Sequence, residues 1–230
     1  MMKHIKIALL ISLLALPFYK SYSQDEYVWE WGASIGGSYY MGDANWSKPF
    51  KHTGLAGGMM ARRILNPHMA IKGNLSVGRI SGNTNELKNA YPNNEQSEFK
   101  RIVFDLGAQF EYNFLGYGTN TYRGDKRFTP YIIGGIGLTF LPKPAKETFT
   151  INFPLGIGVK YKIAPRINIG CEYAIRFTLS DKLDVSSKEG MQLADPYQIK
   201  GKGFKNKDSY TFALFFITYN FGLKCRDCNN

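Results

Sequence analysis

The chain has 230 residues, enough for one ordinary domain or a single barrel and too few for two well-packed domains. Phe, Tyr and Trp number 16, 15 and 3 and Gly numbers 24, a mixture that favours sheets over helices. The formal net charge is +11, yet the basic residues are spread along the chain and 44% of all residues are hydrophobic, which excludes a disordered tail, a coiled coil and a disulfide-dense miniprotein.

The amino terminus has the pattern of an export signal. Basic residues precede an apolar run over Ile7–Phe18, and the small residues Ser21 and Ser23 occupy the positions that a signal peptidase inspects. The apolar run is shorter than the roughly 20 residues that a membrane-spanning helix needs. We therefore predict a signal peptide over residues 1–23 and an exported mature chain.

Beyond residue 23, the strongest pattern is an alternation of apolar and polar residues with a period of two, which is typical of β-strands. Over Ile151–Ile163, every odd-numbered residue is apolar and the even-numbered residues are Asn, Pro, Gly or Lys. The same pattern predicts eight strands, over residues 28–40, 53–65, 69–80, 99–114, 128–141, 151–163, 166–178 and 209–223. The register of the second strand stays open, because the glycines and methionines at positions 54–60 do not choose a face.

The predicted connections alternate in length. Residues 66–68 and 164–165 make tight turns, residues 115–127 an intermediate connection, and the polar segments 41–52, 81–98, 142–150 and 179–208 the remaining connections. Long strands with short turns at one rim and long loops at the other are typical of outer-membrane barrels. We therefore predict an all-β fold, an eight-stranded antiparallel transmembrane β-barrel over residues 24–223, with short periplasmic turns and longer extracellular loops. Both termini would then be periplasmic, including a tail over residues 224–230.

Charged residues occupy the face of the strands opposite the apolar one. If the apolar face points to lipid, four acids and four bases lie in the lumen and are expected to form a hydrogen-bonded charge network. The predicted lumen residues are Glu30, Lys72, Asp105, Glu111, Lys160, Lys162, Glu172 and Arg176. Inward glycines such as Gly107 and Gly158 would leave space for the lysine and arginine side chains. Eight strands enclose only enough room for side chains, so no wide pore is expected.

A soluble sandwich or lipocalin-like barrel is the alternative, with its apolar face inward and its charged face in water. The long apolar faces, the export signal and aromatic residues near strand ends favour the membrane barrel. These aromatic residues are Trp29, Trp31, Tyr39, Tyr112, Tyr161 and Tyr219.

Three cysteines have two different interpretations. Cys171 lies on the apolar face of a predicted strand and is expected to behave as a small hydrophobic residue. Cys225 and Cys228 form a C-x-x-C pair in the tail, in an oxidising compartment. A zinc site would need two further ligands and a thioredoxin motif would need a helix start, so a local disulfide and a covalent bond to a partner both remain open. We expect no metal and no cofactor.

Enzyme signatures are missing from the sequence, which favours a non-enzymatic protein. Some eight-stranded barrels modify lipid A, and for that class Ser47 and His52 would be the only candidate pair.

Lysines at positions 200–207 are expected to contact lipopolysaccharide phosphate at the cell surface, or simply to solvate the loop, and not to bind nucleic acid. The expected non-protein partners are therefore outer-membrane lipid and lipopolysaccharide.

The mature start resembles a known family. Tyr27–Asp43 reads YVWEWGASIGGSYYMGD, an aromatic-Glu-apolar-Gly strand that runs into Tyr-x-Gly-Asp, and Thr129–Gly137 fits less specifically. This start resembles the opening strand of a family of outer-membrane proteins of Bacteroidota that includes PorG. The resemblance implies a part in the type IX secretion system, which exports proteins and supports gliding, as an integral barrel that attaches a periplasmic ring of the lipoprotein PorK and its partner PorN. A free-standing surface barrel for adhesion or envelope stabilisation, acting through its outer loops, is the alternative.

Overall fold

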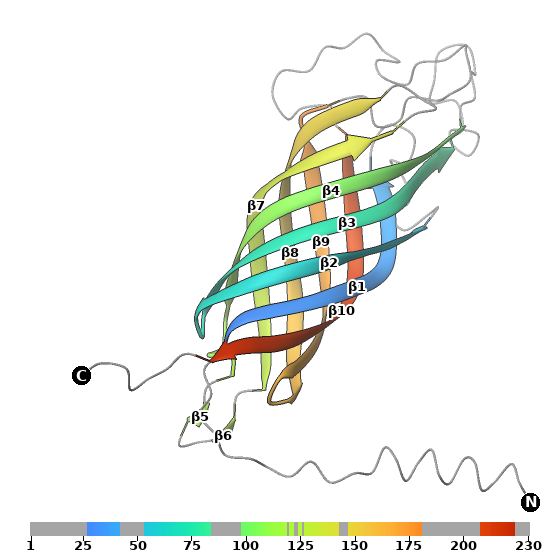
Figure 1. The fold of residues 1–230 in the computed structure, drawn as a ribbon. Helices are drawn as coiled ribbons and strands as arrows, with labels where there is room; N and C mark the ends of the chain where they lie inside the picture. The colour runs from blue at the N-terminus through green and yellow to red at the C-terminus, as the bar shows by residue number, and fades with distance from the viewer. Residues whose placement is uncertain are drawn as a thin grey trace, which may run out of the picture.

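The fold is a closed antiparallel barrel of eight long strands, with a separate two-stranded sheet beyond one end of it (Figure 1). The computed structural model describes residues 27–41, 53–83, 98–118, 120–121, 124–125, 127–142, 147–180 and 208–223. The barrel strands are β1 (Tyr27–Met41), β2 (Gly54–Asn66), β3 (Met69–Asn83), β4 (Glu98–Asn113), β7 (Phe128–Leu141), β8 (Thr148–Ala164), β9 (Ile167–Thr178) and β10 (Ser209–Leu223). The predicted eight-stranded barrel is confirmed, because each predicted strand is present to within a few residues.

The strands follow one another around the barrel in chain order, and β1 closes it by pairing with β10. This closing pair is continuous, from Tyr27 opposite Leu223 to Met41 opposite Ser209. A closed ladder leaves no unpaired strand edge, which is the condition for a sheet to sit in a hydrocarbon environment.

The register fixes the width of the barrel. A row of paired residues that starts at Trp29 passes once around all eight strands and returns to β1 at Tyr39. The strands are thus staggered by ten residues per circuit and must tilt steeply, as they do in Figure 1. An eight-stranded barrel of this kind has an interior just wide enough for side chains.

The two ends of the barrel differ. At the end that we call the turn rim, β2 and β3 are joined by a tight turn, as are β8 and β9, and β1 begins where β10 ends. Backbone hydrogen bonds tie the turns to neighbouring strands, from Asn113 N to His68 O (2.7 Å) and from Asn220 N to Arg166 O (2.8 Å). At the opposite end, the loop rim, the strands lead into the longer connections. The predicted separation of short turns from long loops is therefore confirmed.

Side chains alternate strictly between the two faces of the sheet. On β3, residues Ile71 to Ile80 alternate exposed and buried, with Ile71, Leu75 and Val77 outside and Lys72 and Asn74 inside. Large apolar side chains cover the outer surface around the barrel, while the lumen holds charged and polar side chains together with two groups of buried apolar ones. This distribution is the reverse of a soluble barrel and is that of a membrane barrel.

The connection between β4 and β7 contains structure that the sequence pattern did not predict. Two short strands, β5 (Asn120–Thr121) and β6 (Gly124–Asp125), pair as a minimal hairpin that lies beyond the ends of the barrel strands at the turn rim (Figure 1).

Several predicted features lie outside the described residues. They are the signal peptide over residues 1–23, the pair Ser47 and His52, and the tail with Cys225 and Cys228. Among the residues that the structure does describe, no helix is long and apolar enough to span a membrane.

A charge on the outer face should destabilise the barrel most near the middle of a strand. Leu106 lies mid-strand on β4 and is 55% exposed, whereas Phe128 begins β7 at the turn rim and is 46% exposed. We expect Leu106→Arg to lower the free energy of unfolding by about 2–4 kcal/mol and Phe128→Arg by about 0–1 kcal/mol, because an arginine near the rim reaches the interface. Urea unfolding in lipid bilayers measures both values. Equal costs at the two positions would contradict a lipid-facing exterior.

Candidate functional site

The half of the lumen nearest the turn rim is held by one shared arginine. The guanidinium of Arg62 on β2 donates to Glu30 on β1 and, at 2.8 Å, to Glu111 on β4. Glu111 also accepts from the ammonium of Lys160 on β8, and Glu30 from the hydroxyl of Thr218 on β10. All these side chains are buried, so four charged groups and one hydroxyl join five strands.

A second ion pair extends this turn-side cluster. Lys72 on β3 donates to Glu172 on β9, and the Tyr131 hydroxyl on β7 donates to the same carboxylate at 2.8 Å. Lys160 also lies 5.0 Å from the centre of the Tyr131 ring. Every barrel strand therefore contributes a side chain to the turn-side cluster, which we define as Glu30, Arg62, Lys72, Glu111, Tyr131, Lys160, Glu172 and Thr218.

The loop-side cluster is a separate network around Asp105. Its carboxylate accepts from Arg176 at 3.2 Å, from the Tyr210 hydroxyl at 2.8 Å, and from the side-chain amides of Asn74 at 3.0 Å and Asn152 at 2.8 Å. The two central carboxylates, of Asp105 and Glu111, belong to residues that are six positions and roughly 20 Å apart along β4. On β3 the two clusters come closer, because Lys72 and Asn74 are only two residues apart. Their charges are balanced within each half of the lumen.

Apolar side chains pack against each cluster. Arg62 lies 5.5 Å from the centre of the Phe216 ring and also approaches the sulfur of Met60, both of which belong to one buried apolar group. Arg176 lies 4.3 Å from the centre of the Phe212 ring, which belongs to a second group. This packing places apolar side chains against the ion pairs, and a buried ion pair is stable only when its remaining polar atoms are also satisfied.

Tyr117 lies across the mouth of the lumen at the turn rim. Its backbone N donates to Pro67 O at 3.2 Å, and its hydroxyl donates to Asn168 Oδ1 at 2.8 Å. Lys160 and Lys162 lie 5.0 and 5.7 Å from the centre of its ring. Burial raises the pKa of the Tyr117 phenol above its ordinary value, so the group stays neutral and keeps donating to Asn168.

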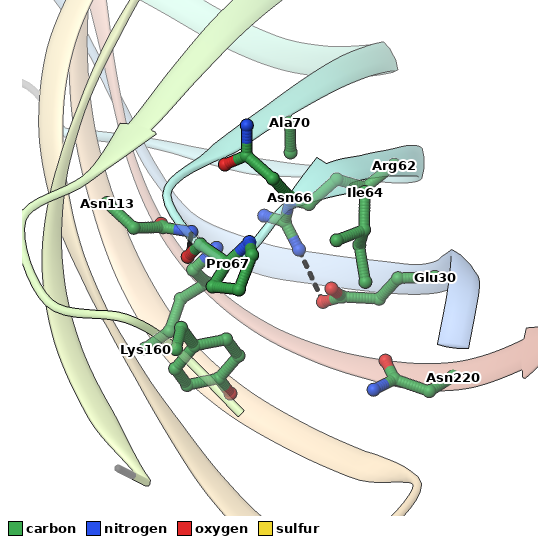
Figure 2. Close-up of a pocket in the computed structure, with 10 residues that line it drawn as sticks. Glu30, Arg62, Ile64, Asn66, Pro67, Ala70, Asn113, Lys160 and Asn220 are labelled. Carbon is green, nitrogen blue, oxygen red and sulfur yellow. Dashed lines mark hydrogen bonds and ion pairs between the residues drawn. The ribbon is translucent and has the colours of Figure 1, made fainter. Parts of the chain in front are cut away.

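A small cavity at the turn rim is lined by Tyr117 and by members of the turn-side cluster. Figure 2 shows the side chains around it, with Glu30 and Arg62 joined by an ion pair and Asn113 and Lys160 on the opposite side. Its volume is about 30 Å³, enough for one or two water molecules. Asn113 Oδ1 is buried with no hydrogen-bond partner among the described residues, so it is the natural acceptor for such a water.

Seven of the eight predicted lumen residues lie in the two clusters. The turn-side cluster holds Glu30, Lys72, Glu111, Lys160 and Glu172, and the loop-side cluster holds Asp105 and Arg176. Lys162 is different, because it is only half-buried and contacts Tyr117 at the mouth.

The sequence pattern missed the arginine on which the turn-side cluster depends. Arg62 and Arg63 are adjacent, and only the strand register decides which of them points inward.

The expectation that the inward glycines leave space for lysine and arginine side chains was wrong in part. A Cβ on Gly158 would meet the Tyr131 ring, and one on Gly107 would meet the Asn74 amide, so these glycines make room for an aromatic and an amide side chain.

Metal and thiol chemistry have no visible site in the described part of the chain. No group of three or more His, Cys, Asp or Glu side chains there could hold a metal ion. Cys171 is a free thiol, half-buried on the outward face of β9.

Comparison with known proteins identifies the family. A family model described as "Domain of unknown function (DUF6089)" matches residues 6–230. The chain belongs to the DUF6089 family. No curated protein matches the sequence.

Solved structures similar to this DUF6089 member are small outer-membrane barrels, and the likeness concerns the fold alone. Ail, the attachment invasion locus protein of Yersinia pestis, is 12% identical, with 84% of this chain and 99% of that chain covered and a TM-score of 0.46. Neisserial surface protein A is 13% identical, with 88% and 100% covered and a TM-score of 0.46. The N-terminal barrel domain of Pseudomonas aeruginosa OprF is 12% identical, with 84% and 97% covered and a TM-score of 0.44.

Removing the shared arginine should destabilise this DUF6089 barrel strongly. Arg62→Gln would leave Glu30 without its cation and Glu111 with Lys160 alone, and breaking such a buried pair costs about 3–5 kcal/mol. Arg79→Gln is the matched control, because Arg79 is exposed on the outer face of β3 near the loop rim. Urea unfolding in bilayers should separate the two variants, and a cost below 1 kcal/mol for Arg62→Gln would show that the turn-side cluster does not hold the strands together.

Proposed function

We propose that this protein is a non-enzymatic integral outer-membrane subunit of the type IX secretion system, which attaches a periplasmic ring of PorK and PorN-like proteins to the outer membrane. The observation that carries the proposal is the filled lumen. Two ion-paired clusters and Tyr117 occupy it, and the cavity beside Tyr117 has a volume of only about 30 Å³. A barrel filled in this way fits an attachment and not a conduit.

The turn rim is the surface on which the ring would dock. The export signal and the even number of strands support a periplasmic position for this rim. The β5–β6 hairpin extends from it, and the tail with Cys225 and Cys228 follows Leu223 at the same rim. The resemblance of Tyr27–Asp43 to the PorG-containing family supports PorK and PorN-like proteins as the partners. Lipid around the barrel and lipopolysaccharide at the loop rim complete the proposed environment.

The proposal predicts that ring proteins stay bound through the turn rim. We would purify the tagged protein from its native outer membrane without reductant and identify bound proteins by mass spectrometry. Wild type should retain a lipoprotein ring, and replacing residues 119–126 with a short Gly-Ser linker should release most of it. A shortened loop over residues 185–203 is the control and should retain the ring.

The same preparation tests the tail. A non-reducing gel should show a heavier band for wild type that is lost in a Cys225→Ser, Cys228→Ser double variant if the tail binds a partner covalently. A normal ring yield with no mobility change would assign the two cysteines to a local disulfide. A lone barrel, with no ring in any variant, would contradict the secretion role and favour a free-standing surface barrel.

An attachment should not conduct. In planar bilayers the purified protein should give no steady open channel, because an eight-stranded lumen is only wide enough for side chains and the two clusters occupy it. For comparison, a double variant with Arg62→Gly and Lys160→Gly lacks two long side chains of the turn-side cluster. If this variant folds, it should carry a larger current than wild type. A stable porin-like conductance in wild type would contradict the attachment role.

A further inference from the structure

The outer surface of the turn rim carries an unusual patch where the first and last strands meet. Two exposed arginines, Arg63 on β2 and Arg166 in the β8–β9 turn, flank four exposed aromatic side chains. We call this the seam patch, made of Arg63, Arg166, Trp29, Trp31, Tyr219 and Phe221. The register places these residues together, because Trp29 pairs with both Arg63 and Phe221, and Trp31 pairs with Tyr219.

Arg166 is held in a fixed position by two tyrosines. Its Nε donates to the Tyr27 hydroxyl at 3.0 Å and its Nη1 to the Tyr219 hydroxyl at 3.1 Å. Its Cζ lies 5.5 Å from the centre of the Tyr27 ring. Within the described part of the chain it has no carboxylate partner, and its Nη2 donates no hydrogen bond. The guanidinium is thus oriented, fully charged and able to donate to a ligand.

Arg63 has a similar setting on the other side of the seam. Its Cζ lies 5.8 Å from the centre of the Trp29 ring, and no described acid pairs with it. Between the two arginines, Trp31 is 61% exposed and packs edge-to-face against Phe221 with the ring centres 6.0 Å apart. An arginine that lies over an aromatic ring and has no carboxylate partner keeps N–H donors available for an anion such as phosphate.

The surroundings of the seam patch select the kind of anion. Directly beside it, the apolar outer surface continues along the same strands through Ile35 and Ile217, which are 63% and 56% exposed. Tryptophan and tyrosine favour the boundary between hydrocarbon and headgroups, and guanidinium matches phosphate oxygens in two-pronged hydrogen bonds. A ligand that covers the whole patch therefore has a phosphate and a hydrocarbon chain in one molecule.

We infer that the seam patch is a binding site for an anionic phospholipid of the leaflet at the turn rim, with its phosphate on Arg166 or Arg63 and its acyl chains along Trp31 and Ile217. An acidic protein segment would pair with the arginines but would leave the adjoining apolar strands uncovered. The inference needs insertion in a membrane and does not depend on the secretion role.

Native mass spectrometry tests the site on the full mature chain in detergent. Wild type titrated with phosphatidylglycerol should retain a bound lipid molecule. A double variant with Arg63→Gln and Arg166→Gln should bind the lipid about tenfold more weakly, as expected for the loss of charge-assisted hydrogen bonds. Arg79→Gln, an exposed arginine near the loop rim, is the matched control and should bind as wild type does. The heat-dependent shift in gel mobility of folded barrels verifies that every variant is folded.

Further ligands separate the lipid from other anions. Phosphatidylglycerol brominated on its acyl chains should quench tryptophan fluorescence, and Trp31→Phe should remove much of that quenching. Inorganic phosphate at millimolar concentration should not displace the lipid, since it lacks the chains. Equal lipid retention by wild type and the double arginine variant would overturn the site, as would displacement by inorganic phosphate or tighter binding of a polyglutamate peptide than of the lipid.

Discussion

The structure depends on two ion pairs that share one arginine: Arg62 lies between Glu30 and Glu111, inside a barrel whose outer surface is apolar. Taking three charges out of water is costly, and the cost is offset only if each charge has a close partner and its other polar atoms are bonded. Lys160 and Thr218 complete these partners. Because the five residues come from five strands, the same bonds that satisfy the charges also fix how the strands are staggered.

The outer surface explains why the charges are inside at all. A membrane barrel must present apolar side chains to lipid, and the period of two then sends every alternate side chain into the lumen. An eight-stranded lumen is too narrow for bulk water, so its polar groups must satisfy one another. The charge balance between Asp105 and Arg176, and between Lys72 and Glu172, follows from that constraint. The narrow lumen also limits side-chain size: the Tyr131 ring occupies the space that a side chain at Gly158 would fill.

The sequence predicted those parts of the fold that depend on a local pattern. Alternation over Ile151–Ile163 was enough to place β8 and to assign Lys160 to the lumen, because a strand has only two faces. It could not choose between Arg62 and Arg63, since the glycines and methionines that precede them fit either face. Pairing with β1 and β3 makes that choice. Tyr117 could not be predicted either, because its position comes from contacts with Pro67 and Asn168, which are distant in the sequence.

The two adjacent arginines, Arg62 and Arg63, show how the inner and outer faces of the barrel differ in role. Arg62 points inward and is ion-paired with two carboxylates, and the clusters around it and around Asp105 occupy the lumen, so the lumen has little room for a ligand. Arg63 points outward and has no acidic partner among the described residues, although it sits beside a tryptophan. Within the lumen, buried side-chain atoms of Asn74, Gln109 and Asn152 lack a hydrogen-bond partner among the described residues, but arginines without an acidic partner lie on the outer surface. The turn rim combines these arginines with the start of β1, the end of β10 and the β5–β6 hairpin. The contact groups at the turn rim therefore lie next to a network of ion pairs, hydrogen bonds and a cation–π contact to which all eight barrel strands contribute a side chain.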